Sequence, residues 1–244
     1  MAVAERVLIE RHTSQRMKMI QKGFLTGLPI MFGYLPIAIT FGVLASQSGM
    51  TLMELTAMSV FVYAGAAQFM GANMIALGAG SIEIIIATFV LNFRHFVLSL
   101  SFMNRSKALD IKWKAPLSLG LTDESFSVAS LHTKEANEKD GAYFYVGLML
   151  TAYLSWVLGS VLGGILGDVI PESLSMSMGI ALYAMFIALL IPSVKVEVRF
   201  GIIAVLAMIF NYIFNIQMAQ GWAIICSTLL ASFIGTLFVK VEEK

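Results

Sequence analysis

Long apolar runs separated by short polar connectors dominate the chain. About 20 apolar residues in a helix are enough to cross a hydrocarbon core of roughly 30 Å. Eight runs approach or exceed this length, and they cover residues 24–45, 52–79, 82–103, 115–132, 142–166, 176–194, 200–217 and 221–240. The pattern predicts an all-α polytopic membrane protein with a single transmembrane domain over residues 23–240.

Composition supports a membrane protein and excludes several other classes. Hydrophobic residues make up 58% of the chain and charged residues only 13%, against roughly 25% charged in an average soluble domain. The net charge of +1 is too small to attract nucleic acid. The single cysteine, Cys226, excludes an internal disulfide. Residues 1–22 are polar and basic, and we interpret them as a cytoplasmic N-terminal segment.

The basic connectors set the expected topology, because cytoplasmic loops of membrane proteins are enriched in Lys and Arg. If all eight runs cross and the N-terminus is cytoplasmic, connector 104–114 falls outside despite its four basic residues. A re-entrant segment among the first three runs, paired with a re-entrant fourth run, would bring this connector inside. Run 52–79 is long enough to hide a break, and run 115–132 contains Asp123 and Glu124. We predict six to eight crossings with both termini cytoplasmic.

The first run, GLPIMFGYLPIAITFG, combines Pro29 and Pro36 with several glycines, among them Gly33. Each proline removes a backbone donor, and glycine lowers the energy of non-helical dihedrals. We therefore expect a proline/glycine-broken first helix that faces protein or a wet cavity, since lipid cannot satisfy freed backbone groups. The alternative is a kinked helix that packs closely through its glycines.

The later part of the second run, YAGAAQFMGANMIALGAG, contains many small residues and two amides, Gln68 and Asn73. Small residues let another helix approach closely, which explains most of this stretch. Tyr63 and Gln68 can in addition bond a polar ligand, although an interhelical hydrogen bond is an equally available role for Gln68.

The motif LNFRH puts Asn92, Arg94 and His95 inside an apolar run. A charge near the bilayer centre is unfavourable by about 2.5 kcal/mol or more, so Arg94 needs a partner, and Asp123 and Glu124 are the candidates. The pair is either a structural bridge between two spans or part of a cavity that binds a zwitterion or passes a proton. Histidine has the ordinary pKa closest to physiological pH, which suits a proton relay.

A weak internal similarity indicates a duplication of the transmembrane domain. Tyr34 followed by Tyr63 recurs, with nearly the same separation, as Tyr153 followed by Tyr183. Many transporters are built from such repeats, with the substrate site between the halves.

Five ordered motifs, GLPI, GYLPIAITFG, YAGAAQF, LNFRH and TDESF, resemble the AzlC family, the large subunit of two-component branched-chain amino-acid exporters. The resemblance implies a permease of the bacterial inner membrane that exports valine, leucine, isoleucine and sometimes methionine. It also implies a small hydrophobic AzlD-type partner subunit. Substrate-binding residues implied by the match are Pro29, Gly33, Tyr34, Pro36, Tyr63, Gly65, Gln68 and Asn92. The implied charge and proton relay comprises Arg94, His95, Asp123 and Glu124.

Two other functions remain open from the sequence. An intramembrane enzyme could use His95 and Ser99, four residues apart on one helix, while a non-transporting subunit could use its buried charges for assembly. Metal-ligand clusters, phosphate-binding loops and nucleophile motifs are absent from the sequence, so we expect no metal and no cofactor.

Overall fold

The protein is all-helical in the part that the computed structural model describes, residues 2–107, 109–136, 138, 140–167 and 169–238. The described residues contain eleven helices and no strand. The helices are α1 Ala2–Gln47, α2 Leu52–Phe61, α3 Gly65–Ala76, α4 Ser81–Arg105, α5 Ile111–Leu119, α6 Asp123–Leu131, α7 Thr133–Ala136, α8 Ala142–Leu166, α9 Glu172–Val196, α10 Val198–Asn215 and α11 Gln220–Phe238.

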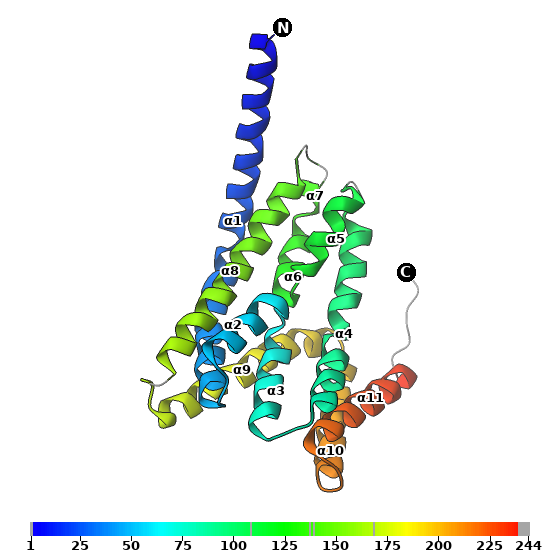
Figure 1. The fold of residues 1–244 in the computed structure, drawn as a ribbon. Coiled ribbons are helices and arrows are strands. Elements are labelled where there is room, and N and C mark those ends of the chain that lie inside the picture. The colour runs from blue at the N-terminus through cyan, green and yellow to red at the C-terminus, as the bar shows by residue number, and fades with distance from the viewer. Residues whose placement is uncertain (1, 108, 137, 139, 168, 239–244) are drawn as a thin grey trace.

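Two long helices, α1 and α8, run side by side in the same direction and form the spine of the fold (Figure 1). Near the start of the pair, a Cβ on Gly23 would lie 2.0 Å from the carbonyl oxygen of Phe144. Near its end, a Cβ on Gly163 would lie 2.1 Å from the carbonyl oxygen of Ile39. No side chain fits at such distances, so glycine is required for this close approach.

The structure corrects the expected break in the first apolar run. α1 continues through Pro29 and Pro36 without interruption. Each proline removes only one intrahelical hydrogen bond, and the turns on either side hold the helix together. Gly27 and Gly42 contact α8, so they serve helix packing, which was the alternative interpretation. The predicted boundary at residue 22 also falls inside α1, whose first turns project beyond the other helices (Figure 1).

Helices α2 and α3 form a hairpin instead of one long helix. α2 packs along α8. Leu55 lies beside Gly164, and the carbonyl oxygen of Val60 accepts a hydrogen bond from Tyr153 Oη at 3.0 Å. The chain then reverses, and Tyr63 adopts a φ of 42°, a left-handed conformation that is uncommon outside glycine. α3 returns beside α2. The second run therefore contains a break at residues 62–64.

Helices α5 and α6 form a second hairpin, which approaches from the opposite end of the molecule (Figure 1). α5 runs antiparallel to α4, since Ser99 Oγ donates to the carbonyl oxygen of Ser118 and His95 bonds that of Leu121. After residues 120–122 the chain turns back along α4, where the guanidinium of Arg105 lies 5.7 Å from the ring centre of Phe126. The fourth run is thus also interrupted, and the tips of the two hairpins meet halfway along α4.

Charged side chains gather at the end of the molecule where α1 begins. We call this end the basic end. Lys22 Nζ lies 3.0 Å from Glu135 Oε1, and Arg16 and Lys112 line one cavity there. Burial alone would raise the pKa of Glu135, but the hydrogen bond from Lys22 and neighbouring charges lower it overall. Asp110 of the basic connector lines the same cavity, so this part of the connector lies at the basic end.

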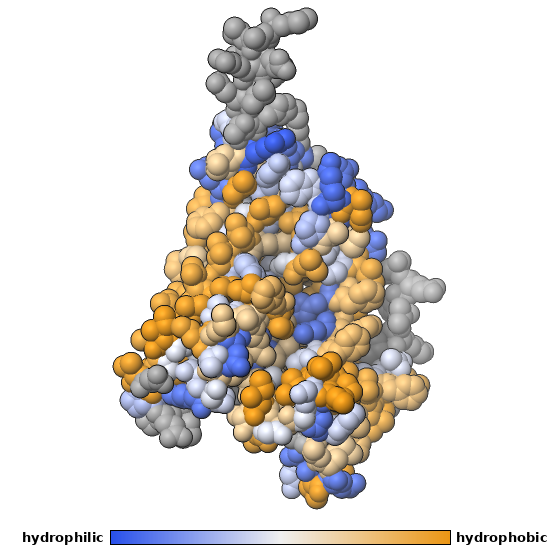
Figure 2. Space-filling model, in the orientation of Figure 1, coloured by the Kyte–Doolittle hydropathy of each residue, from blue (hydrophilic) through white to orange (hydrophobic). Residues whose placement is uncertain are grey.

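Apolar side chains cover much of the surface between the two ends (Figure 2). Among the described residues, four helical stretches are long and apolar enough to cross a membrane, namely Ser14–Gln47, α4, α8 and α10. α10 packs on α9 and α11, and α11 packs on α4. The proposed duplication is not tested, because the side chain of Tyr183 lies outside the described part.

Candidate functional site

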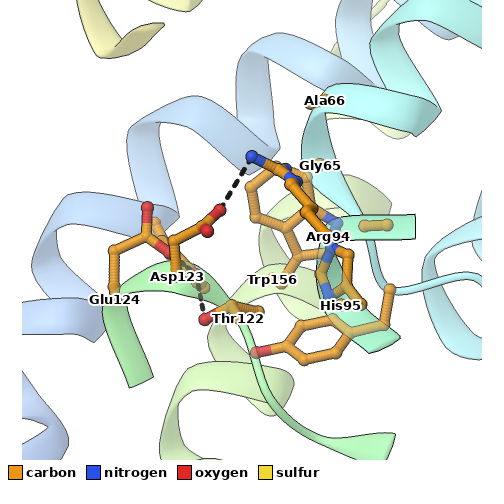
Figure 3. A pocket seen from close by; sticks show the side chains of 11 residues that line it. Gly65, Ala66, Arg94, His95, Thr122, Asp123, Glu124 and Trp156 are labelled. Atoms are coloured by element: carbon orange, nitrogen blue, oxygen red, sulfur yellow. Dashed lines mark hydrogen bonds and ion pairs between the residues drawn. The ribbon is translucent and has the colours of Figure 1, made fainter. Parts of the chain in front are cut away.

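A pocket lies where the tips of the two hairpins meet, between α1, α4 and α8 (Figure 3). The cavity volume in this arrangement of the side chains is about 30 Å³. Arg94 and Trp156 lie near the middle of α4 and α8, so the pocket is far from both ends of the molecule. Its lining residues are Tyr34, Tyr63, Ala64, Gly65, Ala66, Arg94, His95, Thr122, Asp123, Glu124 and Trp156.

An ion pair crosses the pocket from α4 to α6. Arg94 Nη1 lies 2.8 Å from Asp123 Oδ2, and about a third of each side chain is exposed, 34% and 30%. In Figure 3 the two side chains point toward each other. Nε of Arg94 has no hydrogen-bond partner among the described residues, although it is buried. The guanidinium therefore retains an unused donor beside the pocket.

Tyr34 connects α1 to the second hairpin. Its hydroxyl donates to Glu124 Oε2 at 2.5 Å and lies 2.7 Å from Thr122 Oγ1. Thr122 also caps α6, because its Oγ1 accepts from the backbone N–H of Ser125. A hydroxyl donor to a carboxylate is among the stronger hydrogen bonds in proteins. Tyr34 thus fixes the position of one carboxylate at the edge of the pocket.

Two further polar groups at the pocket, on His95 and Tyr63, have no hydrogen-bond partner among the described residues. His95 Nδ1 lies 3.0 Å from the carbonyl oxygen of Leu121, and a carbonyl can only accept, so this nitrogen carries the proton. In the neutral imidazole Nε2 is then an acceptor, and within the described chain neither it nor Tyr63 Oη has a hydrogen-bond partner. Buried polar atoms are normally satisfied by protein, water or ligand, so these groups are available to a polar ligand or to ordered water.

Two helices begin at the pocket. α3 starts at Gly65, and no side chain caps its first turn, since the residue before it is Ala64. α6 starts at Asp123. A helix N-terminus presents free N–H groups and a partial positive charge, which favour a carboxylate. The uncapped start of α3 and the cation on Arg94 make one part of the pocket suitable for an anion, while Asp123 and Glu124 suit a cation.

The indole of Trp156 forms an aromatic wall. It packs edge-on against Tyr34, with ring centres 5.4 Å apart. A Cβ on Gly65 would lie only 2.6 Å from Trp156 Cη2, so the indole covers the first residue of α3. Sequence reasoning missed Trp156, as well as Ala64, Ala66 and Thr122.

Comparison with known proteins gives the family. The protein-family model described as "AzlC protein" matches residues 29–170 of the chain, and this range contains every residue that lines the pocket. The chain belongs to the AzlC family.

Several AzlC-like relatives are known by sequence. An "Uncharacterized membrane protein" of Helicobacter pylori strain J99 is 33% identical over 59% of this chain and 62% of its own length. "Inner membrane protein YgaZ" of Escherichia coli is 30% identical over 57% of each chain. "Branched-chain amino acid transport protein AzlC" of Bacillus subtilis is 26% identical over 62% of this chain and 60% of its own. The chain thus matches about three fifths of the length of these relatives. No solved structure matches it.

The structure brings most of the predicted site residues together, but not all of them. Pro29, Gly33 and Pro36 lie on α1 outside the pocket lining, and so does Asn92 on α4, whose buried Oδ1 has no partner among the described residues. Gln68 lies behind Trp156 and is fully buried. The pocket contains the other predicted residues, which are Tyr34, Tyr63, Gly65, Arg94, His95, Asp123 and Glu124.

Proposed function

We propose that the chain is an inner-membrane permease that exports the branched-chain amino acids valine, leucine and isoleucine, and methionine. One observation carries the proposal: a single pocket in the middle of a helical bundle offers a cation, carboxylates, an uncapped helix start and apolar walls. These are the complements of a zwitterion with an aliphatic side chain. The name of the Bacillus subtilis relative supports the same substrate class.

Each part of the substrate has a partner in this proposal. The α-carboxylate binds Arg94 and the N–H groups at the start of α3, and the ammonium group binds Asp123 and Glu124. The aliphatic side chain lies against Ala66 and the indole of Trp156. Because the ligand splits the Arg94–Asp123 pair and satisfies both partners, binding leaves no net charge unpaired in the pocket.

Export of the substrate is coupled to protons in this proposal. The bare Nε2 of His95 can accept a proton, and Asp123 and Glu124 lie in the same pocket. Valine efflux should therefore fall when an imposed pH gradient is collapsed with an ionophore. Efflux that stays constant would remove proton coupling and leave the transport proposal intact.

We further propose six full crossings, by α1, α4, α8, α9, α10 and α11, with α2–α3 and α5–α6 as re-entrant hairpins. Helices of 9 to 12 residues reach only about 14–18 Å, roughly half of a hydrocarbon core. The basic residues at the basic end support a cytoplasmic location for that end. With an even number of crossings, both termini lie on the cytoplasmic side.

Reconstitution tests the proposal. Vesicles preloaded with labelled valine should release it faster when they contain this chain together with the small AzlD-type subunit expected as its partner. Unlabelled leucine and isoleucine should compete, and lysine should not. Absence of valine release, with or without the partner, would contradict the permease and favour a subunit with a role in assembly alone.

The arrangement of His95 and Ser99 does not resemble a catalytic pair. Nδ1 of His95 is bonded to the carbonyl oxygen of Leu121, whereas Ser99 Oγ donates to that of Ser118 at 3.3 Å. The two side chains therefore serve to hold α5 against α4. An intramembrane enzyme has no support from these contacts.

Removing the hydroxyl of Tyr34 should weaken transport without unfolding the protein. Tyr34→Phe deletes the donor to Glu124, and a hydrogen bond to a charged group is worth about 1.5–3 kcal/mol. We expect valine flux to fall about tenfold or more. Tyr212→Phe is the matched control, because Tyr212 is exposed on α10. Equal flux in the two variants would contradict a role for Tyr34 in the pocket.

A further inference from the structure

A closed ring of hydrogen bonds lies directly behind the pocket. Ser160 Oγ donates to the carbonyl oxygen of Trp156 at 2.8 Å, and Ser59 Oγ donates to Ser160 Oγ at 2.8 Å. Gln68 Nε2 donates to Ser59 Oγ at 2.9 Å, and Trp156 Nε1 donates to Gln68 Oε1 at 2.8 Å. The ring therefore begins at the backbone of Trp156 and returns to its indole.

The ring joins three helices at one point. Ser59 belongs to α2, Gln68 to α3, and Ser160 and Trp156 to α8. The side chains of Ser59, Gln68 and Ser160 are fully buried, and Trp156 is 2% exposed, so water does not compete for these bonds. Satisfied networks of this kind are rigid, because breaking any one bond leaves a buried polar group unpaired.

The ring determines where the indole stands relative to the start of α3. Trp156 Cη2 would lie 2.6 Å from a Cβ on Gly65, so the indole and Gly65 are already in contact. A stacked contact with Phe41, at 6.5 Å between ring centres, supports the indole from its other side. Trp156 therefore has little freedom to move away from the pocket.

We propose that Trp156 determines the substrate size that the pocket accepts, and that Gln68 is the positioning residue that holds it there. The inference rests on the proposed transport of amino acids with aliphatic side chains. With the indole held against Gly65, the apolar part of the pocket ends at its rim, and side chains bulkier than those of the branched-chain amino acids and methionine, such as the ring of phenylalanine, are excluded. Release of the indole would admit them.

Binding competition tests the selectivity. Purified protein is incubated with labelled valine and with unlabelled leucine or phenylalanine. In Trp156→Phe and in Gln68→Met, the affinity for phenylalanine relative to valine should rise about tenfold, the scale of discrimination that an apolar pocket provides. Gln68→Glu, as a neutral carboxylic acid in this buried place, keeps an acceptor for the indole and a donor for Ser59, and should retain the original ratio. Gln47→Met is the matched control, since within the described part of the chain the Gln47 amide donates to the carbonyl oxygens of Gly167 and Ile170, away from the ring.

Fluorescence tests the positioning independently of any substrate. Replacing Trp113 and Trp222 with phenylalanine leaves Trp156 as the single tryptophan of the chain. In this background, Gln68→Met should increase quenching of the indole by acrylamide, because the released ring reaches the pocket, whereas Gln68→Glu should not.

The outcomes separate the two proposals. An unchanged phenylalanine-to-valine ratio in folded Trp156→Phe and Gln68→Met would overturn the selectivity role while leaving amino-acid transport intact. Unchanged quenching in Gln68→Met would overturn the positioning role, whether or not valine binds. Absence of valine binding in the unmodified protein would overturn the proposed function, and quenching would still report on the ring.

Discussion

Arg94→Gln is expected to reduce valine flux by about 100-fold or more. In the proposed complex the guanidinium binds the substrate carboxylate, and truncating one partner of a desolvated charge pair weakens binding by about 2–5 kcal/mol. Arg94→Lys should restore little, because a lysine ammonium cannot present the paired donors of a guanidinium. Flux into or out of vesicles, normalised to the amount of reconstituted protein, measures the effect.

The double variant Arg94→Gln/Asp123→Asn distinguishes a binding role from a structural bridge. Each single change leaves one charge without its partner, and because both side chains are about a third exposed, we expect a loss of stability of only about 1–2 kcal/mol. The double variant removes both charges and should recover thermal stability in detergent. If flux recovers together with stability, the pair is a structural bridge between α4 and α6, and the binding role is wrong.

Gly163→Val is expected to prevent stable packing of α1 on α8. Its Cβ would lie 2.1 Å from the carbonyl oxygen of Ile39, and backbone in a helix cannot move aside as a flexible side chain can. Overpacking usually destabilises by about 1–3 kcal/mol, and this backbone clash should reach or exceed the upper value. We expect a marked loss of monodisperse protein on size-exclusion chromatography after heating.

Gly33→Ala is the control for this packing prediction. Gly33 is also in the middle of a long helix, but among the described residues no atom outside the adjoining backbone of its own helix lies within 4 Å of the position of its Cβ. Alanine should leave stability unchanged or raise it by about 0.5–1 kcal/mol, the helix preference over glycine. Similar losses of folded protein in both variants would mean that the close α1–α8 approach does not determine stability.

The apolar pattern predicted the long helices well, because burial in lipid imposes the same length on every crossing. The run 142–166 coincides with α8, and 82–103 lies within α4. The interruptions were harder to place. Proline and glycine content indicated a break in α1, whereas the observed breaks at 62–64 and 120–122 contain no proline.

The observed breaks depend on contacts that are distant in sequence. The end of α2 is held by Tyr153, whose hydroxyl bonds the carbonyl oxygen of Val60, 93 residues away. No local pattern around Tyr63 reveals that contact. The charge distribution was a better guide to the breaks. Eight full crossings would put the basic connector 104–114 outside, and this conflict indicated that one early run and the fourth run turn back.

The charged part of the site was predictable for a physical reason. Arg94 lies in an apolar run and requires an anion, and the fourth run contains the carboxylates that can supply it, so the pairing with Asp123 follows from electrostatics. Trp156 was missed because an aromatic residue in an apolar span is usually a packing residue. Gln68 was recognised as an unusual amide, but only the structure shows that both ends of its side chain are occupied.

The contacts of the first hairpin have a consequence for how the chain is made. Its polar backbone and side chains find their partners on Tyr153, Trp156 and Ser160, and a ribosome adds these residues only after roughly 90 more have followed the hairpin. Until then the hairpin can pack only on α1 and α4, and the groups that later bond α8 lack those partners. We therefore expect the pocket to be completed only after α8 has been synthesised.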